Sequence, residues 1–243
     1  MLDVIREHIE KGKIYRIVFF GDSLVAADSV HPNWTDIVNY VLKNELKMLM
    51  GDWRPPYQKV KCINSGIDGS NTEDWLEELD RLVFFYKPNL VISLLGINDY
   101  AIHQFTTQRH KGAVEELARL VAGSVDNYFY CTSIPANNEG WQIKYREYVE
   151  VVKKIELPDD VALVDVFNKF LNFDLDKLFT FVSEEGYEDV GLDIKPGDID
   201  YFHPNQLGHA YIAKVILKEI FNVEFDPEKY MTDTLAGKMY PDY

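Results

Sequence analysis

The chain has 243 residues, 47% of them hydrophobic, which is enough for one α/β domain with a full core. Its formal net charge of −15 argues against a nucleic-acid partner, because phosphates are bound by clusters of Lys and Arg and the sequence has no basic stripe. The same charge would repel anionic lipids, and no segment approaches the ~20 apolar residues of a membrane-spanning helix, so we expect no membrane partner.

Strand-like and helix-like segments alternate along the chain, as a parallel sheet with crossover helices requires. The predicted strands are 14–20, 60–63, 90–95, 128–132 and 161–166, and the predicted helices are 36–50, 72–86, 108–122, 142–156 and 205–221. No linker or internal repeat interrupts this alternation. We therefore predict a single domain over residues 1–243, with a polar C-terminal extension from about residue 226 that packs on the domain or on a second copy.

Gly21, Asp22, Ser23 and Leu24 directly follow the first predicted strand. A hydroxyl at Ser23 would therefore lie at the carboxyl end of a buried strand, where open α/β sheets keep their ligand sites. A Gly-Asp pair is also common in ordinary turns, so the tetrapeptide alone is weak evidence. Ser23 is a candidate nucleophile, and a serine hydroxyl needs a base to activate it.

Asp200 and His203 are the candidates for that activation, since one short loop can supply both a base and the acid that orients it. His209 is a rival base, but it falls inside the last predicted helix, where we expect it to be solvated or hydrogen-bonded. Asp193 and Asp198 are rival orienting acids that lie farther from His203 in the sequence. The spacing favours Asp200 and His203.

Two further segments can supply donors for the oxyanion that forms when an acyl group is attacked. Gly69 lies in a glycine-containing segment after the second predicted strand, where a backbone N–H can approach a ligand closely. Gly66 in the same segment is the alternative donor. Asn98 follows the third predicted strand and offers a side-chain amide at the same sheet edge, although Asn in such a place is also a common turn residue or cap.

Asp22 and Asp99 each neighbour one of these candidates. Either carboxylate could hold its loop or the adjacent asparagine in place through hydrogen bonds. Ordinary turn chemistry explains both equally well.

Together these segments resemble the GDSL or SGNH hydrolases, which are named after their Ser, Gly, Asn and His residues. The matching blocks are Gly21-Asp22-Ser23-Leu24, Asn64 to Gly69, Gly96-Ile97-Asn98-Asp99 and Asp200-Tyr201-Phe202-His203. The resemblance spans roughly residues 14–222. It implies a flavodoxin-like α/β/α sandwich of three layers with a five-stranded parallel sheet, cleavage of esters, thioesters or sometimes amides, and an oxyanion hole made by Ser23, Gly69 and Asn98.

The expected function is serine-dependent hydrolysis of a small acyl ester through an acyl-enzyme, with a small-molecule or carbohydrate ester, such as an O-acetylated sugar, as substrate. The alternatives are an acyltransferase that uses the same residues and a non-catalytic module that binds a glycan or another ligand. The irregular stretch from about residue 170 to 198 could form part of the substrate pocket. Trp34, Trp53 and Tyr57 could line it or simply pack, and segment 106–109 and Trp141 are further candidates for substrate contact.

The sequence has no His-Glu-x-x-His or Cys-x-x-Cys motif, so we expect no metal and no cofactor. Cys62 and Cys131 lie in apolar strand-like segments, which favours reduced buried thiols over a disulfide. The N-terminus lacks the apolar core of a signal peptide, which predicts a cytoplasmic protein. A homo-oligomer is possible, but the sequence does not determine the oligomeric state.

Overall fold

The computed structural model describes residues 1–28, 30–187 and 191–243. Its strands are β1 (Tyr15–Gly21), β2 (Val60–Asn64), β3 (Leu90–Leu95), β4 (Asn127–Thr132) and β5 (Val161–Val164). Its helices are α1 (Leu2–Glu10), α2 (Trp34–Met50), α3 (Arg54–Lys59), α4 (Thr72–Leu82), α5 (Ile97–Ala101), α6 (Thr107–Ala122), α7 (Glu139–Val152), α8 (Val166–Phe170), α9 (Leu175–Leu178), α10 (Gln206–Ile216) and α11 (Pro227–Leu235). A 3₁₀ turn, η1 (Phe84–Tyr86), follows α4, and a π-helical turn, η3 (Leu217–Phe221), continues α10.

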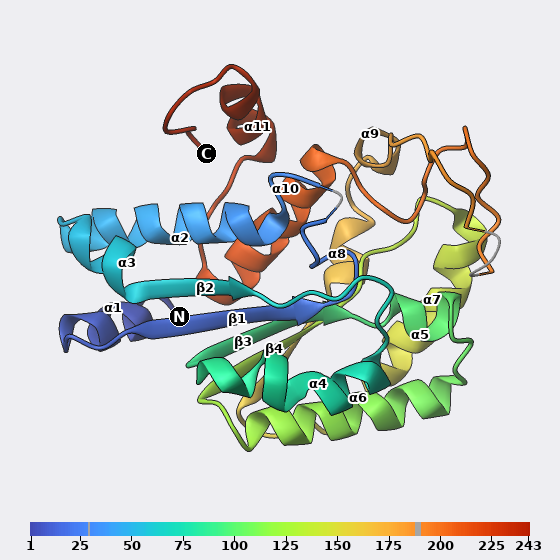
Figure 1. Cartoon of the computed structure of the whole chain (residues 1–243), viewed down its shortest axis with the longest axis horizontal. Helices are drawn as coiled ribbons and strands as arrows, with labels where there is room; N and C mark the ends of the chain where they lie inside the picture. The colour runs from blue at the N-terminus through green and yellow to red at the C-terminus, as the bar shows by residue number, and fades with distance from the viewer. Residues whose placement is uncertain (29, 188–190) are drawn as a thin grey trace.

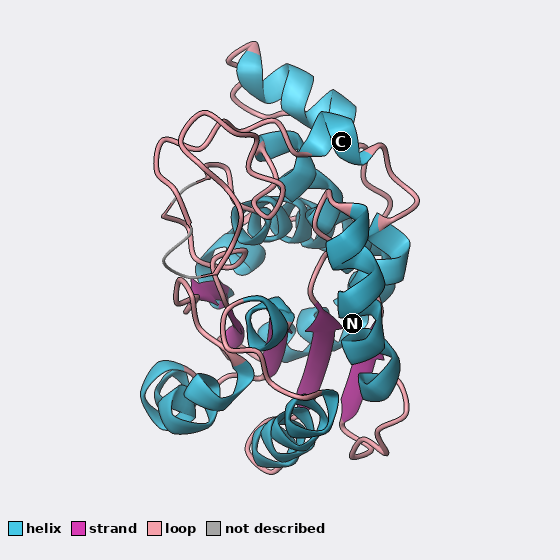
Figure 2. Ribbon diagram, turned by 90° about the vertical axis from the view of Figure 1, so that its right-hand side faces the viewer, coloured by secondary structure: helices cyan, strands magenta, loops and turns pink. Residues whose placement is uncertain are grey.

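The five strands form one parallel sheet in the order β2-β1-β3-β4-β5. In Figure 1, α2, α3 and α10 cover one face of this sheet, and α4 and α6 cover the other. Figure 2 shows the same layers with helices on both sides of the strands. This arrangement is the predicted α/β/α sandwich, with the flavodoxin-like strand order.

Alternating side chains of the strands fill two cores, one on each face of the sheet. Ile17 and Phe19 of β1 pack into the core under α2 and α10, whereas Val18 and Phe20 pack into the core under α4 and α6. Every residue of β3 is buried, as expected of a central strand covered on both faces. The fully apolar sequence of β3 therefore reflects its position in the middle of the sheet.

Asparagine caps fix where two of the long helices begin. Asn33 accepts a hydrogen bond from the backbone of Thr35 and forms a reciprocal capping box with Asp36, so α2 starts two residues earlier than predicted. Asn71 forms the same kind of box at the start of α4. The predicted helix 72–86 was too long, because α4 ends at Leu82 and a 3₁₀ turn follows.

The C-terminal segment packs on α2 of the same chain, which is one of the two predicted alternatives. This segment also contains a helix, α11. The Tyr243 hydroxyl donates to the Glu45 carboxylate at 2.9 Å, and the Tyr40 hydroxyl donates to the Pro241 carbonyl at 3.0 Å. In the described part of the chain, no helix is both long and apolar enough to cross a membrane.

Candidate active site

Ser23 lies in the turn after β1, at the carboxyl edge of the sheet. β1 ends at Gly21, where a Cβ would lie 2.0 Å from the Leu94 carbonyl oxygen, so only glycine allows β1 and β3 to approach so closely there. The Asp22 carboxylate accepts a hydrogen bond from the Leu24 backbone N–H at 3.0 Å. These contacts fix the turn that carries Ser23.

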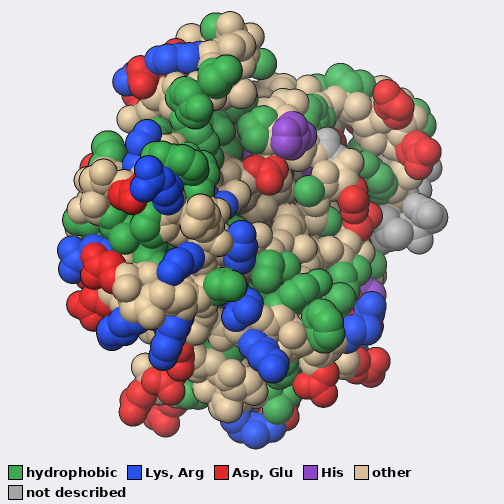
Figure 3. Space-filling model, turned by 60° about the vertical axis from the view of Figure 1, so that its left-hand side comes forward, with side chains coloured by type: hydrophobic (Ala, Val, Ile, Leu, Met, Phe, Trp, Pro, Cys, Tyr) green, Lys and Arg blue, Asp and Glu red, His purple; other side chains and the backbone are tan. Residues whose placement is uncertain are grey.

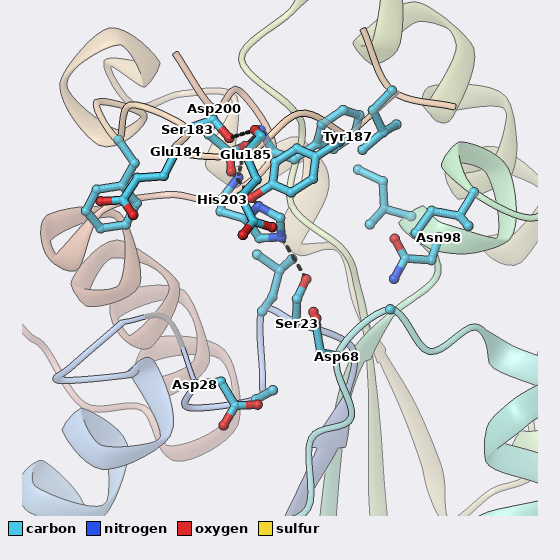
Figure 4. A pocket seen from close by; sticks show the side chains of 18 of the residues that line it. Ser23, Asp28, Asp68, Asn98, Ser183, Glu184, Glu185, Tyr187, Asp200 and His203 are labelled. Atoms are coloured by element: carbon cyan, nitrogen blue, oxygen red, sulfur yellow. Dashed lines mark hydrogen bonds and ion pairs between the residues drawn. The ribbon is translucent and has the colours of Figure 1, made fainter. Parts of the chain in front are cut away.

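The structure brings Ser23, His203 and Asp200 into one chain of contacts, seen in Figure 4. Ser23 Oγ and His203 Nε2 lie 3.0 Å apart, and His203 Nδ1 lies 2.7 Å from Asp200 Oδ2. When the ring carries its proton on Nδ1, the Nδ1–H group donates a hydrogen bond to the Asp200 carboxylate. The unprotonated Nε2 can then accept the proton of the Ser23 hydroxyl. This is the geometry of a nucleophile, a base and an orienting acid.

Asp200 is held firmly in its orienting position. Its Oδ1 accepts backbone hydrogen bonds from Phe202 at 2.8 Å and His203 at 3.0 Å. The rival Asp198 instead accepts from the Lys195 backbone N–H, and Asp193 is exposed. Asp200 is therefore the carboxylate that contacts His203, as the spacing predicted.

Neighbouring groups shift the pKa values of His203 and Asp200 in opposite directions. Burial of the His203 ring lowers its pKa, but the hydrogen bond and charge of Asp200 raise it by more, helped by Asp22 and Asp68, so the pKa of His203 lies above its usual value. Burial raises the pKa of Asp200, but its bonds to His203 and to the two backbone N–H groups outweigh this and hold its pKa below the usual value. The pair therefore favours an ionised acid beside a base of increased proton affinity.

Gly69 and Asn98 line the same cavity as Ser23. Asn98 donates one side-chain N–H to the Ser70 carbonyl at 3.0 Å, and an amide has a second N–H to offer. Gly66 is a poor alternative, because its N–H already donates to Asn64 Oδ1 at 2.9 Å. A Cβ on Gly66 would lie 2.2 Å from the Ala26 nitrogen, so this glycine allows two loops to pack closely.

A second buried carboxylate–histidine pair lies behind the glycine loop and Asn98. Asp99 Oδ2 lies 2.6 Å from His110 Nδ1, and Asp99 Oδ1 accepts the Thr72 backbone N–H at 2.8 Å. Because Asn98 also donates to Ser70, the end of β3 is tied twice to the segment that follows Gly69. Asp99 thus makes contacts beyond its own turn. Sequence reasoning did not single out His110, which approaches from α6.

Asp22 differs from Asp99 because it has no ion-pair partner within the described residues. It is fully buried, and its Oδ2 makes no hydrogen bond there. Burial raises the pKa of Asp22 to about 7, and the Leu24 N–H and the charge of His203 offset this only in part. The turn before the nucleophile therefore contains a carboxyl that is costly to ionise.

The cavity beside Ser23 has a volume of about 680 Å³. Segment 181–187 and Leu192 form one wall, so the irregular stretch does contribute to the pocket, as predicted. The aromatic residues of this wall are Phe181 and Tyr187, which sequence reasoning did not single out.

The aromatic candidates from the sequence do not line this cavity. Trp34 is fully buried and donates to the Leu24 carbonyl at 2.8 Å, which supports the nucleophile turn from beneath. Trp53, which precedes α3, contacts Tyr57 of α3, and Trp141 packs against Phe202. Trp34 and Trp141 therefore have packing roles, which was the alternative interpretation, whereas Trp53 and Tyr57 are exposed outside the cavity.

Segment 106–109, another candidate for substrate contact, makes a helix cap and an ion pair instead. Thr106 caps α6 by accepting the Arg109 backbone N–H, and the Arg109 side chain pairs with Glu73 at 2.6 Å.

His209 lies within α10, as predicted, and of the two expected environments, solvated or hydrogen-bonded, the structure shows the second, because the ring is buried. Burial, with a smaller contribution from the charge of His203, lowers its pKa to about 3. Its Nδ1 accepts the Trp34 backbone N–H at 3.4 Å. A neutral buried ring on this side of the sheet is a packing residue.

Both cysteines are free thiols. Burial raises the pKa of Cys62 to about 12, which does not suit a thiolate nucleophile. In the described ranges, no three His, Cys, Asp or Glu side chains are grouped so that they could hold a metal ion.

A family model described as GDSL-like lipase/acylhydrolase matches residues 19–211. Among solved structures, a lipase/acylhydrolase from Enterococcus faecalis is 22% identical, with a TM-score of 0.62 over 86% of this chain and 96% of that chain. An acetylxylan esterase from Geobacillus stearothermophilus is 19% identical, with a TM-score of 0.61 over 88% of this chain and 96% of that chain. No curated protein matches the sequence.

Proposed function

Because this chain belongs to the GDSL-like lipase/acylhydrolase family, its chemistry is ester hydrolysis, and we propose that it hydrolyses small acyl esters through an acyl-enzyme on Ser23. The observation that carries the proposal is the contact chain from Ser23 Oγ through His203 to Asp200, with distances of 3.0 and 2.7 Å. A non-catalytic binding module would have no need of this alignment.

In the first half of the proposed reaction, Ser23 Oγ attacks the ester carbonyl carbon while His203 Nε2 takes the hydroxyl proton. The carbonyl oxygen becomes an oxyanion, which accepts hydrogen bonds from the backbone N–H groups of Ser23 and Gly69 and from the Asn98 side chain. The bond to the alcohol oxygen then breaks, and the alcohol leaves with the proton from Nε2. Asp200 keeps the imidazole oriented and stabilises its charged form.

In the second half, water gives a proton to His203 Nε2 and attacks the acyl carbon. The bond between that carbon and Ser23 Oγ breaks, and the proton returns to the serine. The products are the carboxylic acid and the free enzyme. Loss of a single oxyanion donor typically costs ~10²–10³ in turnover, so each of the three donors is expected to matter.

The substrate we propose is a short acyl ester, with an O-acetyl group on a carbohydrate as the first choice. A cavity of about 680 Å³ has room for a monosaccharide-sized group beside the serine. The acetylxylan esterase of the same fold makes this a reasonable first substrate. A series of chromogenic esters of increasing acyl length tests it, and a preference for long chains would overturn the choice of acyl group.

Fluorophosphonate labelling followed by peptide mapping tests the nucleophile. We expect the probe to modify Ser23 in the wild type, and we expect Ser23→Ala and His203→Ala to lose both labelling and acetyl-ester turnover. Ser124→Ala and His103→Ala, which change exposed residues outside the cavity, are the matched controls. Wild-type turnover by a folded Ser23→Ala variant would refute the proposal. Product analysis with added sugar acceptors separates hydrolysis from acyl transfer.

A further inference from the structure

The cavity beside Ser23 carries more negative charge than the reaction requires. Besides Asp200, four further acidic residues line it: Asp28, Asp68, Glu184 and Glu185. None of these four forms an ion pair with a described Lys, Arg or His. The described lining residues include no Lys or Arg at all. These four charges therefore lie at the cavity without an ion-pair partner among the described residues.

The four carboxylates lie on both sides of the nucleophile. In Figure 4, Asp28 and Asp68 lie on one side of Ser23, whereas Glu184 and Glu185 lie on the other, with His203. Asp28 follows the nucleophile turn, and the two glutamates belong to the wall formed by segment 181–187. An ester bound at Ser23 therefore has negative charge nearby in either direction that its alcohol part extends.

Four of the lysines lie at the opposite end of the sheet from this cavity. Lys11 and Lys13 precede β1, Lys59 precedes β2 and Lys87 precedes β3, so all four belong to the opposite end of the parallel sheet. Figure 3 shows Lys and Arg side chains interspersed with Asp and Glu on the face at that end. A seven-residue strand such as β1 is about 23 Å long, well beyond the ~8 Å Debye length at physiological salt. These four lysines are therefore too distant to neutralise the acidic residues at the cavity.

Aromatic rings accompany these carboxylates. Phe181, Tyr187 and Phe202 line the cavity, and the Tyr187 ring centroid lies 6.2 Å from that of His203. Aromatic faces attract ammonium groups, and carboxylates add a direct charge attraction. Rings next to unpaired carboxylates suit a cation better than a neutral or anionic group.

We propose that this site selects its ester by the charge on the alcohol part, preferring alcohols that bear an ammonium group and rejecting those that bear a phosphate or carboxylate. The inference rests on the proposed function, because it takes Ser23 as the point of attack. In water, one carboxylate at ~8 Å changes the binding of a unit charge about twofold. At low salt, where the Debye length is ~30 Å, four such groups account for a preference of about tenfold for a cationic over a neutral ester, and for similar discrimination against an anionic one. At the ~8 Å Debye length of physiological salt, the same preference falls to about fourfold.

Three acetyl esters of similar size test the charge preference: acetylcholine, its uncharged isostere 3,3-dimethylbutyl acetate, and 4-acetoxybutanoate. Acid release in a pH-stat gives kcat/KM for each, divided by the rate of its hydroxide-catalysed hydrolysis to remove differences in intrinsic reactivity. We expect the order cation, neutral, anion at low salt. We also expect the three values to converge at ~1 M salt, where the Debye length is ~3 Å.

A charge-matched pair of variants assigns the effect to the cavity. Glu184→Gln/Glu185→Gln should lower the value for acetylcholine and raise that for 4-acetoxybutanoate, an opposite response that damage to the fold would not produce. Glu77→Gln/Asp80→Asn removes the same net charge from exposed positions on α4 and should leave the ratio unchanged.

Equal values for the three esters, or identical ratios in the two variants, would overturn the charge selection while leaving the hydrolase assignment intact. Failure of the wild type to hydrolyse any of the esters, together with no fluorophosphonate labelling of Ser23, would remove both proposals.

Discussion

Replacing Asp22 by Asn should stabilise this protein at neutral and alkaline pH. The Asp22 carboxyl is fully buried, and burial raises its pKa from 3.8 to about 7. An asparagine keeps the oxygen that accepts the Leu24 backbone N–H and has the same shape, but it carries no charge to desolvate. The variant therefore separates the cost of the charge from the role of the side chain in the turn.

The size of the effect follows from proton linkage. A carboxyl whose pKa is higher in the folded than in the unfolded state does not lower the free energy of unfolding at pH values where it is protonated in both states. Stability is then lost as pH rises through the interval between the two pKa values, at ~1.4 kcal/mol per pH unit. For a rise from 3.8 to about 7, the total cost is about 4 kcal/mol, present in full above the folded-state pKa.

Urea unfolding of the wild type and Asp22→Asn at a series of pH values measures this cost. The free energy of unfolding of the variant minus that of the wild type should be smallest near the lower pKa, grow with pH and level off above the higher one. Asp80→Asn, which removes an exposed carboxylate, is the control and should give a small, flat difference. A difference for Asp22→Asn that stays constant with pH, or that falls as pH rises, would refute the reasoning.

Three further predictions concern the site and its supports. Asp200→Asn should lower kcat by ~10⁴-fold, as the equivalent change does in a serine protease. The acid limb of its kcat/KM profile should also move to lower pH, because the carboxylate raises the pKa of His203. An acid limb that stays at the wild-type pH would contradict this reasoning. His110→Ala should lower kcat by up to ~10² with little change in KM, with partial recovery in His110→Asn, which keeps a donor near the Nδ1 position; a matching loss in both variants would indicate only structural damage. Gly66→Ala should destabilise the fold in urea by about 1–3 kcal/mol because its Cβ meets backbone at 2.2 Å, whereas Gly112→Ala on α6, with no atom within 4 Å, should not.

Much of the site could be predicted because of where parallel strands end. The blocks containing Ser23, Gly69 and Asn98 each follow an apolar strand, and the carboxyl ends of parallel strands lie at one edge of the sheet. Their order along the chain was therefore enough to place them together. Asp200 and His203 follow no strand, but their short spacing limited them to one loop.

The supports of the site were harder to predict, because they depend on contacts between distant elements. His110 of α6 reaches Asp99 of α5 through a contact between two helices that neither helix's own periodicity indicates. The wall containing Glu184 and Tyr187 has neither helical nor strand periodicity, so the sequence indicated that the stretch was irregular but not which residues face the serine. His209 was expected to be either solvated or hydrogen-bonded, because helix periodicity does not say how deeply α10 is buried; the structure shows the buried, hydrogen-bonded alternative.

The contact between Ser23 and His203 joins residues that are 180 positions apart. Ser23 is therefore synthesised well before Asp200 and His203. Under the proposed mechanism, Ser23 has no activating base until the segment that contains Asp200 and His203 has left the ribosome and has docked against the turn after β1. Activity of the proposed site thus reports that segments from both ends of the 180-residue interval have folded together.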